Sequence, residues 1–165
     1  VTNGAFKIDS ALQIEAKPAM MSPAKEEKQL ALQDAGTLNH NQYENILPFY
    51  LVLQEALAGD DSQSAQSAYH QLISSGKEFL TLEMSARNSI ETIRNAFQPL
   101  SLSIIKAADS FHHGSIVNEV FCPMAFNNTG ASWLQTTEKI ANPYFGTKML
   151  RCGTLKNRFG GGHGQ

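Results

Sequence analysis

The chain has 165 residues, of which 42% are hydrophobic and 17% are charged. This composition excludes wholesale disorder and suits one ordinary domain with its own core. The formal net charge of −2 argues against nucleic acid as a default partner, because neutralising phosphates requires a basic surface. No apolar run reaches the roughly 18 residues that a membrane-spanning helix needs.

Residues 1–37 have the pattern of an attachment to the main domain. Residues 6–9 alternate apolar and polar side chains after an Asn-Gly turn pair, which is typical of a half-buried strand. A lone strand is not stable by itself. We therefore expect residues 1–37 to be the remnant of a larger β domain, ending in a linker with two prolines and a charged run.

Two helices are predicted in the part of the chain that follows. Apolar side chains recur at steps of three and four residues over residues 46–57, and again over residues 65–73. The Gly-Asp-Asp sequence at residues 59–61 suits the end of the first helix and the cap of the second.

A third apolar pattern covers residues 80–97, and Pro99 then either kinks this helix or opens a fourth one. Short connections between such helices favour antiparallel neighbours. The expected fold class is therefore all-α, with residues 38–159 forming an antiparallel four-helix bundle that carries an irregular C-terminal cap. Residues 160–165, which include four glycines, are expected to be a flexible tail.

The cap segment, residues 111–153, has no helical period and contains an unusual set of metal-ligand side chains. Thiolates and thioethers are soft ligands that favour Cu(I) and, by the same softness, Ag(I). Zn²⁺ accepts cysteine and histidine but has little use for methionine, so it stays an alternative metal. The candidate ligands are two thiols, two thioethers and two adjacent imidazoles: Cys122, Met124, Met149, Cys152, His112 and His113.

Three other interpretations of these residues stay open at this point. Cys122 and Cys152 could form a disulfide, which would stabilise the fold by about 3.7 kcal/mol in the chain-entropy model for a loop of about 31 residues. They could also be inert buried thiols, with the two methionines as core filler. His112 and His113 could simply terminate the preceding helix, where an imidazolium suits the negative end of the dipole.

The sequence contains little that resembles the catalytic motifs of known enzymes. It contains no Gly-rich phosphate loop and no G-x-S-x-G nucleophile turn. A nucleophile pair of Cys122 with His112 or His113 would need a third, orienting group, for which Asn142 is only a guess. We therefore expect no catalytic activity.

Four short motifs occur in order in the last third of the chain, at residues 122–125, 130–134, 142–146 and 149–153. They read Cys-Pro-Met-Ala, Gly-Ala-x-Trp-Leu, Asn-Pro-Tyr-Phe-Gly and Met-Leu-x-Cys-Gly. This series resembles a helical domain family that occurs alone in exported proteins of the Bacteroidetes type. The same domain is found fused to the C-terminus of periplasmic adaptor subunits of heavy-metal efflux pumps.

The resemblance implies a C-terminal piece of a copper or silver efflux adaptor of the resistance-nodulation-division type. Residues 1–10 look like the closing strand of the adaptor's membrane-proximal domain. Such adaptors are periplasmic and link an inner-membrane pump to an outer-membrane channel, which would be the partners of this chain. The ligands that match the family's motifs are the two cysteines and the two methionines, Cys122, Met124, Met149 and Cys152.

These observations predict a domain that binds a soft monovalent metal ion, with the cap packed on the bundle. Four aromatic side chains are expected to make that contact: Phe121, Trp133, Tyr144 and Phe145. The alternative function is an interaction module without metal, in which Cys122 and Cys152 are buried or disulfide-bonded and the domain docks on efflux pump subunits.

Overall fold

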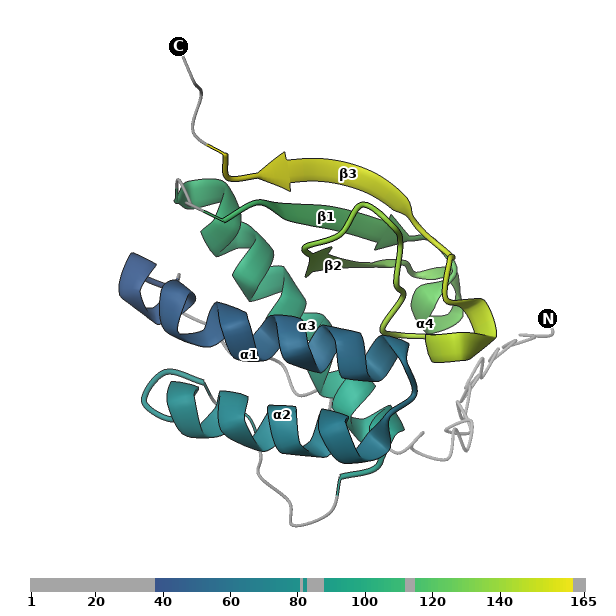
Figure 1. Cartoon of the computed structure of the whole chain (residues 1–165), viewed down its shortest axis with the longest axis horizontal. Coiled ribbons are helices and arrows are strands. Elements are labelled where there is room, and N and C mark those ends of the chain that lie inside the picture. Colours follow the sequence, from purple (N-terminus) through teal and green to yellow (C-terminus); the bar gives the residue numbers. More distant parts are fainter. Residues whose placement is uncertain (1–37, 81, 83–87, 112–114, 162–165) are drawn as a thin grey trace, which may run out of the picture.

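The structure is a computed structural model that describes residues 38–80, 82, 88–111 and 115–161 (Figure 1). The expected strand and linker in residues 1–37 lie outside the described residues. Three long helices come first: α1 (His40–Ala58), α2 (Ser62–Gly76) and α3 (Ile90–Ser110). Three strands with two short helical turns between them follow: β1 (Val117–Cys122), α4 (Ala125–Asn128), β2 (Ala131–Gln135), η1 (Gly146–Met149) and β3 (Thr154–Phe159).

The expected all-α four-helix bundle is wrong, because the fold mixes helices with a three-stranded antiparallel sheet. α3 continues through Pro99, since one missing N–H does not end a helix whose apolar stripe continues on both sides. The cap that was expected to be irregular, residues 111–153, contains β1 and β2, and β3 follows it directly. Their hydrogen bonds join residues far apart in sequence, and no local period reveals them.

Side-chain caps explain where the first two helices begin. Asn39 accepts the backbone N–H of Gln42, while the Gln42 side chain accepts the N–H of Asn39, a complete capping box. Asp61 caps α2 by accepting the N–H groups of Gln63 and Ser64. The predicted break at residues 59–61 thus separates α1 from α2. No helix in the described part of the chain combines the length and apolarity needed to cross a membrane.

The sheet has the strand order β2-β1-β3, with both pairs antiparallel. Val120 in the central strand faces Trp133 on one side and Leu155 on the other, with a register shift between Glu119 and Val120. The sheet lies on one side of α1 and α3, while α2 packs on the other side of the helical layer (Figure 1). β3 forms the outer edge, and five of its six residues are exposed.

One core joins the helices to the sheet. The ring of Tyr50 in α1 stacks on Phe97 in α3 with centroids 4.8 Å apart. Its buried hydroxyl bonds to Ser101 at 2.8 Å and accepts the backbone N–H of Leu134 in β2 at 3.0 Å. Tyr144, which follows the sheet strand β2, packs edge-on against Phe97.

The four aromatic residues expected at the contact between cap and bundle divide into two groups. Trp133 and Tyr144 are buried in the shared core, and Phe145 packs against it. Phe121 instead carries the Lys156 ammonium group 5.3 Å from its ring centroid. The aromatic contact therefore comes chiefly from β2 and from the segment that follows it.

Candidate functional site

The two cysteines meet although they are 30 residues apart in sequence. Cys122 is the last residue of β1 and is completely buried, whereas Cys152 lies just before β3 and is half-buried. Their Sγ atoms are 2.6 Å apart, and both residues carry free thiols. The antiparallel pairing of β1 with β3 brings the two ends together, so the sheet itself creates this thiol pair.

Asn142 fixes the segment that carries Cys152. Its side-chain amide donates to the carbonyl of Cys152 at 2.7 Å, and its side-chain oxygen accepts the N–H groups of Tyr144 and Phe145. The N–H of Cys152 in turn bonds to the carbonyl of Met149 at 2.9 Å. Because Asn142 is fully buried, these directional bonds hold the loop in one arrangement.

The surroundings of Cys152 favour its neutral form. Burial, followed by the adjacent Cys122 thiol, raises the pKa of Cys152 to about 11, while the backbone N–H of Met124 acts in the opposite direction by donating to this sulfur. Cys152 is therefore a thiol at neutral pH. A metal ion that binds it has to displace this proton.

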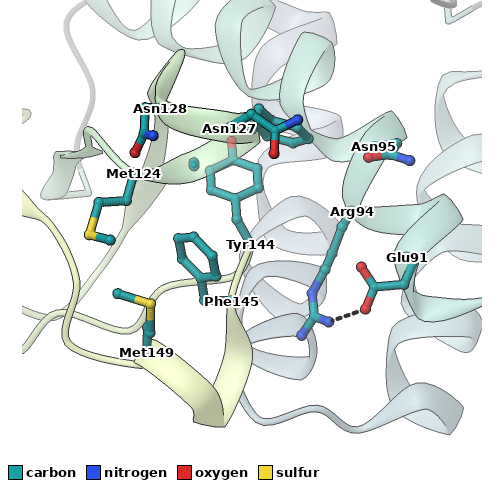
Figure 2. Close-up of a pocket in the computed structure, with 11 residues that line it drawn as sticks. Glu91, Arg94, Asn95, Met124, Asn127, Asn128, Tyr144, Phe145 and Met149 are labelled. Carbon is teal, nitrogen blue, oxygen red and sulfur yellow. Dashed lines mark hydrogen bonds and ion pairs between the residues drawn. The ribbon is translucent and has the colours of Figure 1, made fainter.

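The two methionines lie beside an open hollow of about 480 Å³. Met124 is 47% exposed, and Figure 2 shows it and Met149 on the same side of the hollow, away from Glu91 and Arg94. Tyr144 also lines this space. Neither cysteine lines the hollow, so the link between the two is Met124, which lines the hollow and whose backbone N–H donates to the Cys152 sulfur.

A left-handed turn forms the wall of the hollow next to Met124. Within α4, Phe126, Asn127 and Asn128 all have positive φ angles, of 50°, 56° and 66°. Asparagine tolerates this conformation, but for phenylalanine it costs about 1–2 kcal/mol. Gly130 completes the turn with φ 83°, and a Cβ there would lie 2.5 Å from the Phe121 ring. Strain of this kind persists only where the surrounding structure imposes it.

A cluster of charged and polar side chains around Asp60, here called the clamp, attaches η1 to the helices. The carboxylate of Asp60, between α1 and α2, accepts hydrogen bonds from the Arg94 guanidinium and from the N–H and hydroxyl of Thr147. These bonds, led by that of the Thr147 hydroxyl, lower the pKa of Asp60 to about 2. Arg94 is buried and also donates to the carbonyls of Leu57 and Pro143. The clamp thereby fixes η1, which contains Met149.

Thiols and thioethers are ligands that suit a soft metal ion, but the present distance between the two cysteine sulfurs does not suit binding to one ion. Among the described residues, no three His, Cys, Asp or Glu side chains gather at one point, so an ion here depends on the thioethers as well. Two thiolates on one ion lie about 3.8 Å apart, for metal–sulfur bonds of about 2.3 Å in tetrahedral geometry. The observed 2.6 Å means that Cys152 has to turn away from Cys122 before both can bind.

The structure places the predicted site residues in different surroundings, and two of them lie outside the described part of the chain. The structure brings Cys122 and Cys152 into contact and places Met124 and Met149 around the neighbouring hollow. His112 and His113 lie outside the described residues. Sequence reasoning missed the two groups that position the sulfur-bearing loop, Asp60 and Arg94; it had considered Asn142 only as a guess for a catalytic orienting group. The sole signal for Asp60 was its place in a turn after a glycine.

Comparisons of the chain with protein-family models, with curated proteins and with solved structures find no match.

Proposed function

We propose that this domain binds a soft monovalent metal ion, Cu(I) or Ag(I), at a sulfur site made of Cys122, Met124, Met149 and Cys152. Zn²⁺ is the alternative ion for the two cysteines. The ion is cargo that the domain accepts and passes on, and no catalytic step is part of the proposal. Thioethers suit this task because they bind such ions without adding charge, which keeps release feasible.

The observation that carries the proposal is the contact between Cys122 and Cys152, with sulfurs 2.6 Å apart, next to the backbone of Met124. Four sulfur residues from two distant segments therefore share one end of the sheet. Cys122 is rigid within β1 and the core. Cys152 is the half-buried member, and rotation of its side chain toward the hollow would bring its sulfur nearer the two thioethers.

The wider role that we propose rests on the resemblance of the four motifs at residues 122–153. In this view the domain is the C-terminal part of a periplasmic adaptor of a heavy-metal efflux system. Its partners would be the inner-membrane pump and the outer-membrane channel of that system. The sulfur site would then hold the exported ion close to the pump.

A second function is favoured by one specific observation, the short separation of the two thiols. The bonded S–S distance in a disulfide is about 2.05 Å. The observed distance of 2.6 Å is nearer to this value than to the separation of two thiolates on one metal ion. The domain would then be a structural or docking module for pump subunits, with Cys122 and Cys152 serving to hold β1 to the segment before β3.

The test is a titration of the fully reduced chain with Cu(I) or Ag(I) in the presence of a competing chelator. The proposal predicts one ion per chain. It predicts that Cys122→Ser combined with Cys152→Ser weakens binding at least about tenfold, or about 1.4 kcal/mol. Met124→Leu combined with Met149→Leu is expected to weaken binding less, because neutral thioethers are the weaker ligands.

Leu102→Ala is the matched control, since Leu102 is 49% exposed and Met124 is 47% exposed, and Leu102 does not line the hollow. This variant should bind the ion like the original chain. Unchanged affinity in the double serine variant, with its circular dichroism spectrum preserved, would refute the metal assignment and leave the docking module as the better account.

A further inference from the structure

The thiol pair has a second chemistry besides metal binding. Cys122 and Cys152 are each other's nearest sulfur partners at 2.6 Å, and both are held on well-bonded backbone. Cys122 ends the β1–β2 ladder, where it faces Ala131. Cys152 is fixed by the bonds of its N–H to Met149 and of its carbonyl to Asn142.

Disulfide formation needs little rearrangement from this arrangement. The bonded S–S distance of a disulfide is about 2.05 Å, so the two sulfurs, now 2.6 Å apart, have only a short distance to close. The two thiols also differ in access, because Cys122 is 0% exposed while Cys152 is half-buried at the edge of the core. An external reactant therefore reaches Cys152 first.

We propose that a disulfide between Cys122 and Cys152 is the closed state of the sulfur site, and that reduction of this bond opens the site to metal. The co-reactant belongs to the class of disulfides, either a small one such as oxidised glutathione or that of a thiol–disulfide oxidoreductase. This inference rests on the proposed function, for which it supplies a means of control.

The reaction is an exchange in two steps. The Cys152 thiol first gives its proton to solvent, and the thiolate so formed attacks one sulfur of the co-reactant. This breaks the co-reactant's disulfide, forms a mixed disulfide and releases one thiolate, which takes up a proton as a thiol. The Cys122 thiolate then attacks the Cys152 sulfur and expels the second thiol. In total the pair loses two electrons and two protons, and the co-reactant disulfide becomes two thiols.

Oxidation removes the strongest ligands of the site. Thiolate is the form of cysteine that binds metal ions, and the disulfide has none. Only the two thioethers, Met124 and Met149, remain at the hollow. A bound ion would therefore leave, and the site would accept another only after reduction.

The first part of the test equilibrates the full chain with glutathione buffers of increasing oxidised fraction and follows free thiols and intact mass. We expect two thiols to disappear together, with a mass loss of about 2 Da and no glutathione attached. Peptide mapping without reduction should recover residues 122 and 152 in one linked fragment. Two thiols that persist, or a stable glutathione adduct on the original chain, would overturn the proposal.

The single variants check the order of the two steps. Cys122→Ser keeps the accessible thiol without its partner, so it should accumulate the glutathione adduct. Cys152→Ser keeps only the buried thiol, so it should stay unmodified under the same conditions while the chain is folded. Modification of Cys152→Ser as fast as of Cys122→Ser would contradict the assigned roles.

The second part titrates Ag(I) into the reduced and the disulfide forms of the original chain. We expect the oxidised form to bind at least about tenfold more weakly. Equal affinity of both forms for Ag(I) would contradict the proposal that the disulfide closes the site to metal. If the reduced form itself binds no Ag(I), the proposed function fails, and so does the proposed regulation of metal binding by the disulfide. The mass and the thiol count still show separately whether the disulfide forms.

Discussion

The helical half of the molecule, α1 to α3, and the sheet half, residues 115–161, share one apolar core, but they differ in how their connecting segments are held. The helices pack through apolar side chains such as Leu53, Leu57 and Ile104, all fully buried. The sheet half also buries apolar side chains such as Trp133 and Leu134, and its long loop is held in addition by buried polar side chains that bond to its backbone. Asn142 and Gln135 are the main examples, with Gln135 donating to the carbonyls of Thr137 and Lys139.

This difference bears directly on the site. Apolar packing is non-directional and tolerates rearrangement, whereas hydrogen bonds fix angles as well as distances. The loop that carries Met149 and Cys152 is fixed by such directional bonds. Perturbing the core should therefore weaken both halves together, while perturbing the clamp at Asp60 should act mainly on the loop that carries Met149 and Cys152.

The largest expected effect comes from the aromatic residue that both halves share. Phe97→Ala should reduce the free energy of unfolding by about 3–5 kcal/mol, because its buried ring contacts both Tyr50 and Tyr144. Urea unfolding can be followed by circular dichroism for the helices and by fluorescence of the single tryptophan, Trp133, for the sheet half. Both midpoints should fall together.

Leu102→Ala serves as the control, since this side chain is 49% exposed and its truncation should change stability by no more than about 0.5 kcal/mol. A tryptophan midpoint that stays in place while the helical signal shifts would show that the two halves do not share a core.

A smaller but more local effect is expected at the clamp. Gly146 has φ 59°, and a Cβ there would lie 2.1 Å from an Asp60 carboxylate oxygen. Gly146→Ala should therefore cost about 2–4 kcal/mol through backbone strain and loss of the clamp, measured by the same unfolding curves. Gly59→Ala is matched, because φ is −84° and the nearest atom would be 3.5 Å away.

We expect Gly59→Ala to change stability by less than about 1 kcal/mol. Equal losses in the two variants would mean that the contact between η1 and Asp60 contributes little to the fold.

The smallest expected effect concerns the charge of Asp60. Its pKa is lowered from 3.8 to about 2 in the folded chain, so its contribution to stability is fully present above pH 3.8 and is lost as the pH falls toward 2. Asp60→Asn should thus cost about 1 kcal/mol at neutral pH, an amount reduced by partial exposure of the carboxylate. The difference from the original chain should disappear on acidification.

Asp109→Asn is the control, because Asp109 is exposed on α3. This variant measures how much the free energy of unfolding changes when a carboxylate outside the clamp is removed. A difference between Asp60→Asn and the original chain that stays constant from pH 7 to about pH 2 would contradict an ionised clamp.

The helices could be predicted from the sequence because their signals are local. The apolar stripes at residues 46–57 and 65–73 lie within α1 and α2, and the predicted break at residues 59–61 falls between the two helices. Pro99 was the ambiguous point. It lies within α3, where the stripe on either side of it outweighs one missing hydrogen bond.

The sheet could not be predicted in the same way. The sequence of β1 has two polar residues, Asn118 and Glu119, followed by three apolar ones, and five of the six residues of β3 are exposed. Neither sequence shows the alternation of apolar and polar residues that marks a half-buried strand. Aromatic and turn residues in this region were interpreted as an irregular cap. The pairing of β1 with both neighbours is a long-range property that single-sequence patterns do not contain.

The site was predictable in part. Sulfur chemistry alone selected Cys122 and Cys152, and strand pairing places them in contact. The polar residues that hold the loop carry no comparable signal. Asn142 and Asp60 act through bonds to segments 10 and 87 residues away, so only the folded chain reveals their roles.

X-ray absorption of the reduced chain loaded with one equivalent of Cu(I) tests the central claim most directly. The account predicts a first shell of sulfur alone, at about 2.2–2.3 Å, which is lost when Cys122 and Cys152 are both replaced by serine. A first shell of nitrogen or oxygen, or a sulfur shell that survives the double replacement, would contradict it.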